Sequence, residues 1–397
     1  MSSSREKHGW FDLGVLTPLD WLLPALPAAF LIQFVPGWKN DTLLFFTAAM
    51  AIIPLAGWMG RATERLGERA GAGVGGLLNA TFGNAPELII ALVALSKGLT
   101  GVVKASIIGS ILGNILLVLG LAVLAGGIRF PHLRFNETGT RVAATSLSLA
   151  IIGLIVPSIF HIATERQPGG WSPRAEQGLS VAIAAVLFAT YLCWLLFSLV
   201  THKELFAGRA ESAGERGESD SKPWSVTKSV IILALATTLV AIMSEFLAGS
   251  VETTCKSLGL TEAFVGLIVV AIIGNAGEST AVVVALKNKM DLSLGIAIGS
   301  SLQIALFVMP VLVFASYLFG RPMNLEFSLP EVAAISLAVW IVVLISGDGE
   351  CNWVEGAQLL AVYLVIAILF FFLPEPPPGQ GEKFGERIPE AVGVNAR

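Results

Sequence analysis

The chain of 397 residues is 54% hydrophobic and only 14% charged, with a formal net charge of −4. Soluble globular proteins carry about 25% charged residues, so this composition excludes a soluble enzyme. The small net charge offers no basic surface to a nucleic-acid partner. The apolar residues also occur in blocks of roughly 20, which is the length of a helix that crosses a bilayer.

Eleven apolar stretches predict membrane-spanning helices. They cover residues 20–36, 42–60, 72–96, 102–126, 140–163, 176–201, 226–250, 260–286, 291–319, 329–347 and 353–373. We therefore expect an all-α polytopic membrane protein with about 11 transmembrane helices. The first span is short and contains Pro24 and Pro27, whereas only a tight turn around Lys287 and Lys289 separates the eighth span from the ninth.

Charged segments flank these spans and predict their orientation. With residues 1–19 as a cytoplasmic tail and 20–40 as the first transmembrane helix, 15 of the 25 Lys and Arg residues fall on the cytoplasmic side, which the positive-inside rule favours. Residues 203–225 are then a cytoplasmic linker rich in charge, Gly and Ser, with a regulatory acidic segment as the alternative. Residues 374–397 are expected to be a disordered tail. The short loops favour a bacterial cytoplasmic membrane over an organelle membrane.

Two short motifs are repeated along the chain. GNAPE at 83–87 returns as GNAGE at 274–278, and IGSIL at 108–112 returns as IGSSL at 298–302. Five spans separate the copies, an odd number, so equivalent helices point in opposite directions. This pattern is typical of inverted repeats with a binding site near the midplane. We expect one extra helix, then five helices over 41–202 and five inverted helices over 226–373.

Glu87 and Glu278 lie near the middle of apolar spans, where no basic residue is found. A charge in hydrocarbon is costly, so each carboxylate needs a metal cation or a proton. Neutral oxygen donors accompany them on the same helices or in the next span: Asn84, Asn275, Ser110, Asn114, Ser300 and Gln303. One such side chain usually joins two helices. As a set around two carboxylates they favour calcium, which binds 6–8 oxygen ligands.

The same motifs contain residues that interrupt helices. Pro86 has no N–H group, so the carbonyl of Phe82 loses its helical donor and becomes a candidate backbone ligand. Gly83, Gly274 and Gly277 loosen the helix and allow the backbone to approach an ion. We expect helix breaks at both motifs, where irregular backbone lines an ion site.

The two carboxylates also predict coupling to protons. Like charges in a desolvated pocket repel each other and take up protons when no cation is bound. Calcium and protons then exclude each other from one site, which produces exchange. We find no nucleotide, zinc-protease or CxxC motif, and we predict neither a cofactor nor enzyme activity. Glu245 and Glu252 share a face at the end of the seventh span and are candidates for an access path, with a solvated interfacial face as the alternative.

At these motifs the sequence resembles the calcium/proton exchangers (CAX) of the cation/calcium exchanger superfamily. The resemblance lies in GLLNATFGNAPELIIALVALSKG (76–98) and GNAGESTAVVVALKNKMDLSLGIAIGSSLQIALFV (274–308). It implies an antiporter that removes cytosolic calcium against a proton gradient. It also implies that Glu87 and Glu278 bind calcium and protons, with the six neutral donors around them. The partners would be Ca²⁺, protons and the lipid bilayer.

Two positions depart from the family pattern. Ser279 stands where the family usually has His, and Pro86 resembles the related sodium/calcium exchangers. Sodium coupling therefore remains an alternative to proton coupling. A calcium-selective channel is a second alternative, although a channel needs no inverted pair of carboxylates. A membrane hydrolase is a third, but the sequence offers no nucleophile with a matching base.

Overall fold

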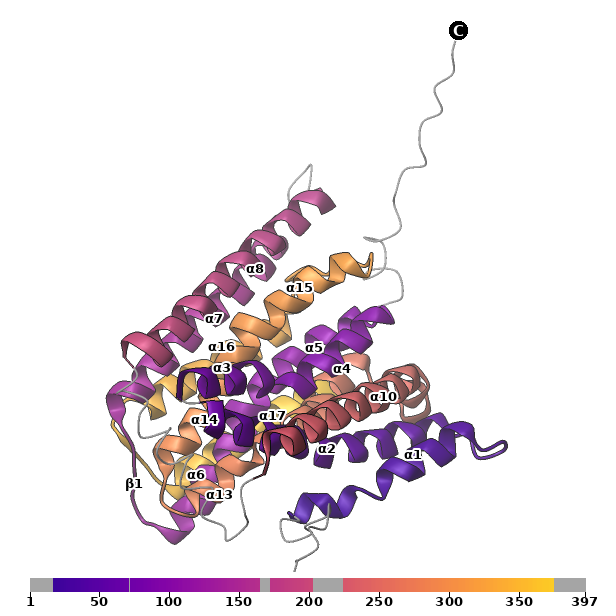
Figure 1. The fold of residues 1–397 in the computed structure, drawn as a ribbon. Helices are drawn as coiled ribbons and strands as arrows, with labels where there is room; N and C mark the ends of the chain where they lie inside the picture. The colour runs from indigo at the N-terminus through magenta and orange to yellow at the C-terminus, as the bar shows by residue number, and fades with distance from the viewer. Residues whose placement is uncertain (1–16, 71, 165–171, 203–223, 375–397) are drawn as a thin grey trace, which may run out of the picture.

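The computed structural model describes residues 17–70, 72–164, 172–202 and 224–374, which are mostly helical (Figure 1). The first half comprises η2 (Pro18–Leu22), α1 (Ala25–Phe34), α2 (Asp41–Ala70), α3 (Ala72–Phe82), α4 (Ala85–Ser96), α5 (Thr100–Leu112), η3 (Gly113–Val118), α6 (Leu119–Arg129), β1 (Leu133–Arg134), α7 (Glu137–Thr164), α8 (Pro173–Leu196) and η4 (Phe197–Thr201). The second half comprises α10 (Val226–Leu258), α11 (Glu262–Phe264), η7 (Val265–Val270), α12 (Ala271–Gly274), η8 (Gly277–Ser279), α13 (Thr280–Ala285), α14 (Met290–Gln303), η9 (Ile304–Val308), α15 (Met309–Leu318), α16 (Leu329–Ile345), β2 (Glu350–Cys351) and α17 (Trp353–Phe372). Apart from a few terminal positions, the predicted linker and both predicted tails lie outside the described residues.

Seven described helices are long and apolar enough to cross a membrane. An eighth candidate joins Glu262–Gly274 to Gly277–Ala285 with a bend of 56°. Shorter apolar helices cover Pro18–Phe34, Ala85–Ser96 and Leu329–Ile345, in the first, third and tenth predicted spans. The all-α polytopic class is thus confirmed. The first span is less regular than predicted, because α1 begins only after Pro24 and has ten residues.

Two central spans form the middle of the protein. The most apolar part of Thr100–Arg129 is 83% buried and that of Met290–Leu318 is 67% buried. The corresponding part of Arg174–Thr201 is only 17% buried. Each central span contains a π-helical turn, η3 in the first and η9 in the second. A wide turn of this kind often marks a functional site within a helix. These two spans carry the repeated Gly-Ser motifs.

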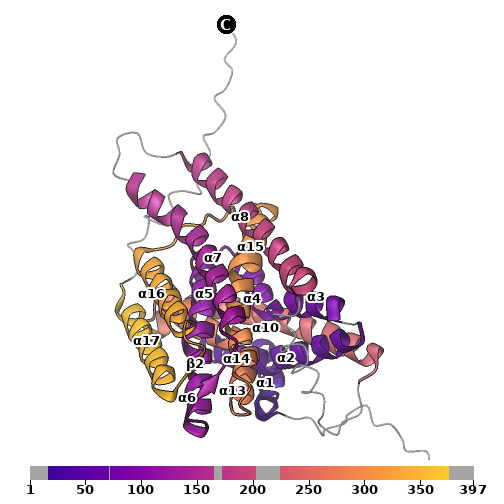
Figure 2. The same cartoon turned by 90° about the vertical axis from the view of Figure 1, so that its left-hand side faces the viewer.

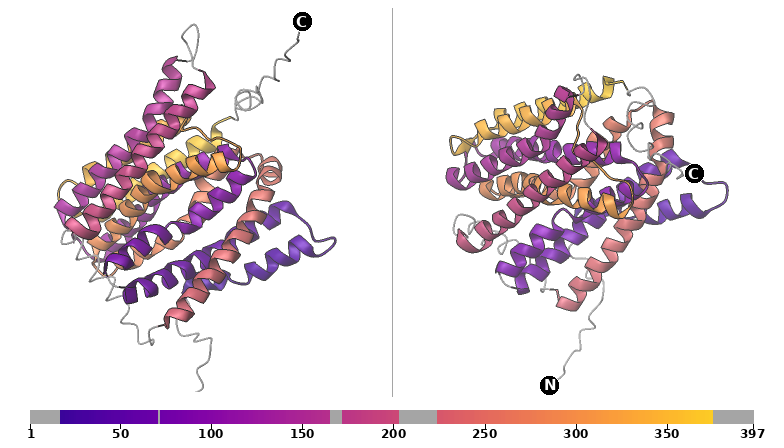
Figure 3. Two further views of the ribbon diagram at one scale, coloured as in Figure 1. Left: turned by 45° about the horizontal axis from the view of Figure 1, so that its top comes forward. Right: turned by 90° about the horizontal axis from the view of Figure 1, so that it is seen from above.

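The first long helices of the two halves, α2 and α10, pack side by side and run in opposite directions (Figures 1 and 3). The hydroxyl oxygen of Thr42, at the start of α2, lies 2.8 Å from that of Ser257, at the end of α10. This antiparallel packing is what the predicted inverted repeat requires of two helices in matching places.

Short strands and helix caps fix the connections between spans. β1 pairs antiparallel with β2, with Leu133 opposite Cys351, and so joins loops of the two halves. α16 and α17 lie on one flank of the bundle (Figure 2) and each begins with a capping box, Ser328 with Glu331 in α16. α10 ends at Gly259, whose φ of +66° is favourable only for glycine.

Candidate cation-binding site

Helix breaks place both repeated glutamates at the start of a helical segment. α3 ends at Phe82 and α4 begins at Ala85, with Pro86 and Glu87 in its first turn. In the second half α12 ends at Gly274, and the short helix η8 contains Glu278. The first N–H groups of a helix have no partner within it, so such breaks leave polar backbone near both carboxylates.

The two motifs approach each other closely because of a glycine. A side chain at Gly274 would place its Cβ 3.0 Å from Cγ of Glu87, so any larger residue would press on this side chain. Glu87 and Glu278 are buried, 8% and 5% exposed, and near enough for their charges to interact. The side chain of Ser300 lies close enough to Glu278 to interact with its carboxylate. No ion pair joins either glutamate to a basic side chain among the described residues.

The two repeated asparagines each reach across to the other half. Asn84 donates from Nδ2 to Oε1 of Gln303 at 2.5 Å. Asn275 donates from Nδ2 to the backbone carbonyl of Ser110 at 2.9 Å, beside Gly113. In both cases the amide nitrogen is used in the protein, which leaves the amide oxygen available.

Oxygen atoms without partners gather at this place. Six buried side-chain atoms of the site have no hydrogen-bond partner among the described residues: Oδ1 of Asn84, Oε2 of Glu87, Oδ1 of Asn275, Oε2 of Glu278, and both Nδ2 and Oδ1 of Asn114. Leaving a buried polar atom unpaired costs about 1–3 kcal/mol. Five of the six atoms are oxygens, which are the ligands that hard cations such as Ca²⁺ require.

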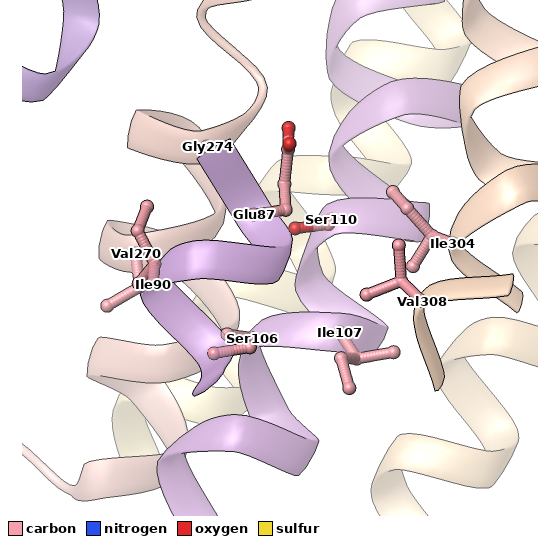
Figure 4. A pocket seen from close by; sticks show the side chains of 10 residues that line it. Glu87, Ile90, Ser106, Ile107, Ser110, Val270, Gly274, Ile304 and Val308 are labelled. Atoms are coloured by element: carbon pink, nitrogen blue, oxygen red, sulfur yellow. The ribbon is translucent and has the colours of Figure 1, made fainter. Parts of the chain in front are cut away.

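A hollow of about 310 Å³ lies beside Glu87 (Figure 4). Figure 4 shows the Glu87 and Ser110 side chains at one end and apolar side chains from α5, η7 and η9 around the rest. Ser106 also lines it, one helical turn before Ser110, and sequence reasoning missed this residue. The spacing of Ser106, Ser110 and Asn114 at intervals of four was the available signal, since it places all three on one face.

The remaining predicted residues lie either at the helix breaks or on the exposed surface of α10. Gly83 lies in the break after α3, where its N–H donates to the carbonyl of Asn79 at 2.8 Å, and Gly277 begins η8. Glu245 and Glu252 are exposed and lie outside the lining of the Glu87 hollow. Glu245 pairs with Lys97 at 2.5 Å, and Glu252 with Lys256 at 2.5 Å. Their role in an access path stays a prediction.

Comparison with known proteins identifies the family of the chain. The sequence model of the family described as "Sodium/calcium exchanger protein" matches residues 41–200 and 228–372. The chain is 48% identical over 348 residues to a Ca²⁺/H⁺ antiporter of Aphanothece halophytica, covering 85% of this chain and 92% of that protein. It is 44% identical over 335 residues to the Ca²⁺/H⁺ antiporter ChaA of Bacillus subtilis, covering 84% and 93%.

Solved structures show the same fold. The structure of native YfkE matches with a TM-score of 0.76 at 38% identity, covering 89% of this chain and all of that one. The H⁺/Ca²⁺ exchanger CAX matches with a TM-score of 0.66 at 12% identity, over 89% and 91% of the two chains, which supports the fold alone. The chain is a multi-pass membrane protein of the exchanger class. It belongs to the sodium/calcium exchanger protein family, and its resemblance to the calcium/proton exchangers is confirmed.

Proposed function

We propose that this protein is a secondary active antiporter that exchanges Ca²⁺ for H⁺. Glu87 and Glu278 would bind calcium and protons in turn, and the amides and hydroxyls around them would complete the calcium shell. The group of unpaired buried oxygens on two broken helices carries this proposal. The 48% and 44% identical relatives, both named as Ca²⁺/H⁺ antiporters, support it.

The coupling follows from charge balance. With Ca²⁺ bound, the two carboxylates are neutralised by the ion, and without it they are neutralised by two protons. The state with two bare carboxylates is unfavourable, because neither has a basic partner among the described residues and both are buried. A site that changes its exposure only in a neutralised state exchanges one cargo for the other. This requires neither a cofactor nor a covalent step.

The donor set favours calcium over softer metals. All the candidate ligand atoms are oxygens, from the side chains of Glu87, Glu278, Asn84, Asn275, Asn114, Ser110, Ser300 and Gln303. Ca²⁺ accepts carboxylate, amide and hydroxyl oxygens together, whereas borderline and soft ions prefer imidazole or thiolate. Carbonyls freed at the breaks around Phe82 and Gly274 would add to the shell.

The direction of transport depends on orientation. We propose that the N-terminus and the 203–225 linker are cytoplasmic, that 41–202 and 226–373 are the two inverted five-helix units, and that the membrane is the bacterial cytoplasmic membrane. An inward proton gradient would then remove calcium from the cytosol and contribute to calcium homeostasis. The excess of Lys and Arg on the proposed cytoplasmic side supports this orientation.

Calcium uptake into proteoliposomes with an imposed pH gradient tests the exchange. We expect uptake that a protonophore abolishes and that a sodium gradient cannot replace. Glu87→Gln and Glu278→Gln should each reduce uptake at least 100-fold, because each removes one of the two charges that Ca²⁺ must meet. Glu68→Gln, which changes an exposed carboxylate at the end of α2, is the matched control and should transport normally.

Two outcomes would contradict the proposal. Uptake that survives the protonophore and requires sodium would assign the protein to sodium coupling. Normal uptake by either glutamine variant would remove that carboxylate from the site. Gel filtration of each variant in detergent separates loss of transport from loss of fold.

A further inference from the structure

Three side chains of metal-ligand type converge at a place remote from the Glu87 hollow. His161 lies near the end of α7, Glu176 in the first turn of α8, and Glu326 in the segment between α15 and α16. Nδ1 of His161 is 2.8 Å from Oε1 of Glu176 and 3.2 Å from Oε1 of Glu326. The three side chains are 27%, 12% and 22% exposed and line a hollow of about 230 Å³.

Buried hydrogen bonds hold the Glu326 segment in place. The hydroxyl of Ser180 on α8 accepts from the N–H of Leu325 at 3.0 Å. The hydroxyl of Ser158 on α7 accepts from the N–H of Phe327 at 2.8 Å. Both serines are buried, and their bonds flank Glu326 on each side. The carboxylate is thereby positioned over the helix pair before any ligand arrives, which is what a preorganised site requires.

The charges around this cluster are unbalanced. The carboxylates of Glu176, Glu326 and Glu331 all act on one ammonium, that of Lys104, which donates to the backbone carbonyl of Glu326 at 2.9 Å and to the side chain of Asn324. Three negative charges against one positive charge leave a net charge of −2 when the imidazole is neutral. Nδ1 of His161 faces two carboxylate oxygens at once.

We propose that His161, Glu176 and Glu326 form a second cation site, which binds a borderline divalent transition-metal ion such as Zn²⁺. Two ligands of one tetrahedral zinc ion, each at 2.0–2.2 Å, are separated by about 3.4 Å. The measured separations of 2.8 and 3.2 Å are close to this value. Water completes the coordination, since the hollow is partly open. The bound ion joins α7 and α8 of the first half to the segment before α16 in the second half.

This site differs in chemistry from the Glu87 site. One imidazole nitrogen among three ligands favours zinc and similar ions over the harder Ca²⁺, which prefers an all-oxygen shell. The two sites also share no residue, so each can be removed separately. The proposal therefore stands independently of the transported substrate.

Zinc titration of the purified, tag-free protein tests the site by calorimetry. We expect one zinc ion per chain, with its affinity reduced at least ten-fold by Glu176→Gln and by His161→Gln. X-ray absorption should show nitrogen and oxygen neighbours at 2.0–2.2 Å. His132→Gln removes an exposed histidine outside the cluster and should leave this binding unchanged.

A second arm separates the two sites. The double variant Glu87→Gln with Glu278→Gln should keep its zinc binding. Loss of zinc there, or unchanged affinity in His161→Gln, would overturn the proposal. Zinc should also raise the unfolding temperature of the wild type but not of Glu176→Gln, whose shape is preserved. A rise of equal size in both would likewise count against it.

Discussion

The chain packs closely where α5 crosses η7. It packs much less closely on the matching face of α14. At Gly109 an added Cβ would lie 2.6 Å from Cα of Leu267, so backbone meets backbone there. At Gly299, the equivalent glycine of the second half, no atom of the part of the chain that the structure describes lies within 4 Å of an added Cβ. The flanking polar residues follow this difference: Ser110 is buried, whereas Ser300 is partly exposed.

The comparison shows that a symmetric sequence repeat is folded asymmetrically. One half closes its glycine-containing crossing, and the other half leaves the equivalent face open. In the proposed orientation α14 leads from the cytoplasmic side to the midplane, and α5 leads from the opposite side. The closely packed crossing would then lie toward the outside, and the open face of α14 toward the cytoplasm. Exchange of cargo requires the two arrangements to alternate.

Alanine substitution should reveal the difference between Gly109 and Gly299 most strongly, as opposite changes in stability. Gly109→Ala adds a Cβ that meets the fixed backbone of Leu267 and should destabilise the protein by about 1–3 kcal/mol. Gly299→Ala adds a Cβ in open space within a helix and should be neutral or stabilising by about 0.5–1 kcal/mol. Thermal unfolding of both variants in detergent measures the difference. Equal losses of stability in both would contradict the asymmetry.

Thiol labelling should sharpen the comparison of the two polar faces. In a background free of Cys193, Cys255 and Cys351, Ser300→Cys should react with a water-soluble thiol reagent at least ten-fold faster than Ser110→Cys. Both positions hold serine at the same place in the repeat. The expected difference in rate therefore reports only their access to water. Equal rates would mean that the open face of α14 is not reached by water. Gel filtration of each variant in detergent is the control for fold.

The sequence predicts the chemistry of the cation site better than its shape. Glu87 and Glu278 are recognisable because a charge in the middle of an apolar span must have a function. The breaks follow from Pro86 and the motif glycines. The sequence does not predict that α4 continues as a regular helix while η8 and α13 form a shorter, bent segment, because this depends on packing between the halves.

Other features are invisible in sequence for a different reason. The motifs at Gly109 and Gly299 are nearly identical, so no local pattern distinguishes the closed crossing from the open one. Glu326 is far from His161 and Glu176 along the chain, and only the tertiary fold brings the three together. The short first span is explained in part by Asp20, which is buried against Arg61 at 3.1 Å and Trp58 at 2.6 Å.

The smallest change in stability is expected at the ion pair between Lys97 and Glu245, which lies outside the α5–η7 crossing and the open face of α14. Its side chains are 30% and 55% exposed, so Glu245→Gln should change stability by less than about 1 kcal/mol. If Glu245 lines an access path, the same variant should raise the calcium concentration needed for half-maximal uptake, because it removes a negative charge that attracts the ion. Glu350→Gln, another exposed carboxylate, is the matched control. An unchanged calcium dependence in both variants would assign Glu245 to the solvated helix surface.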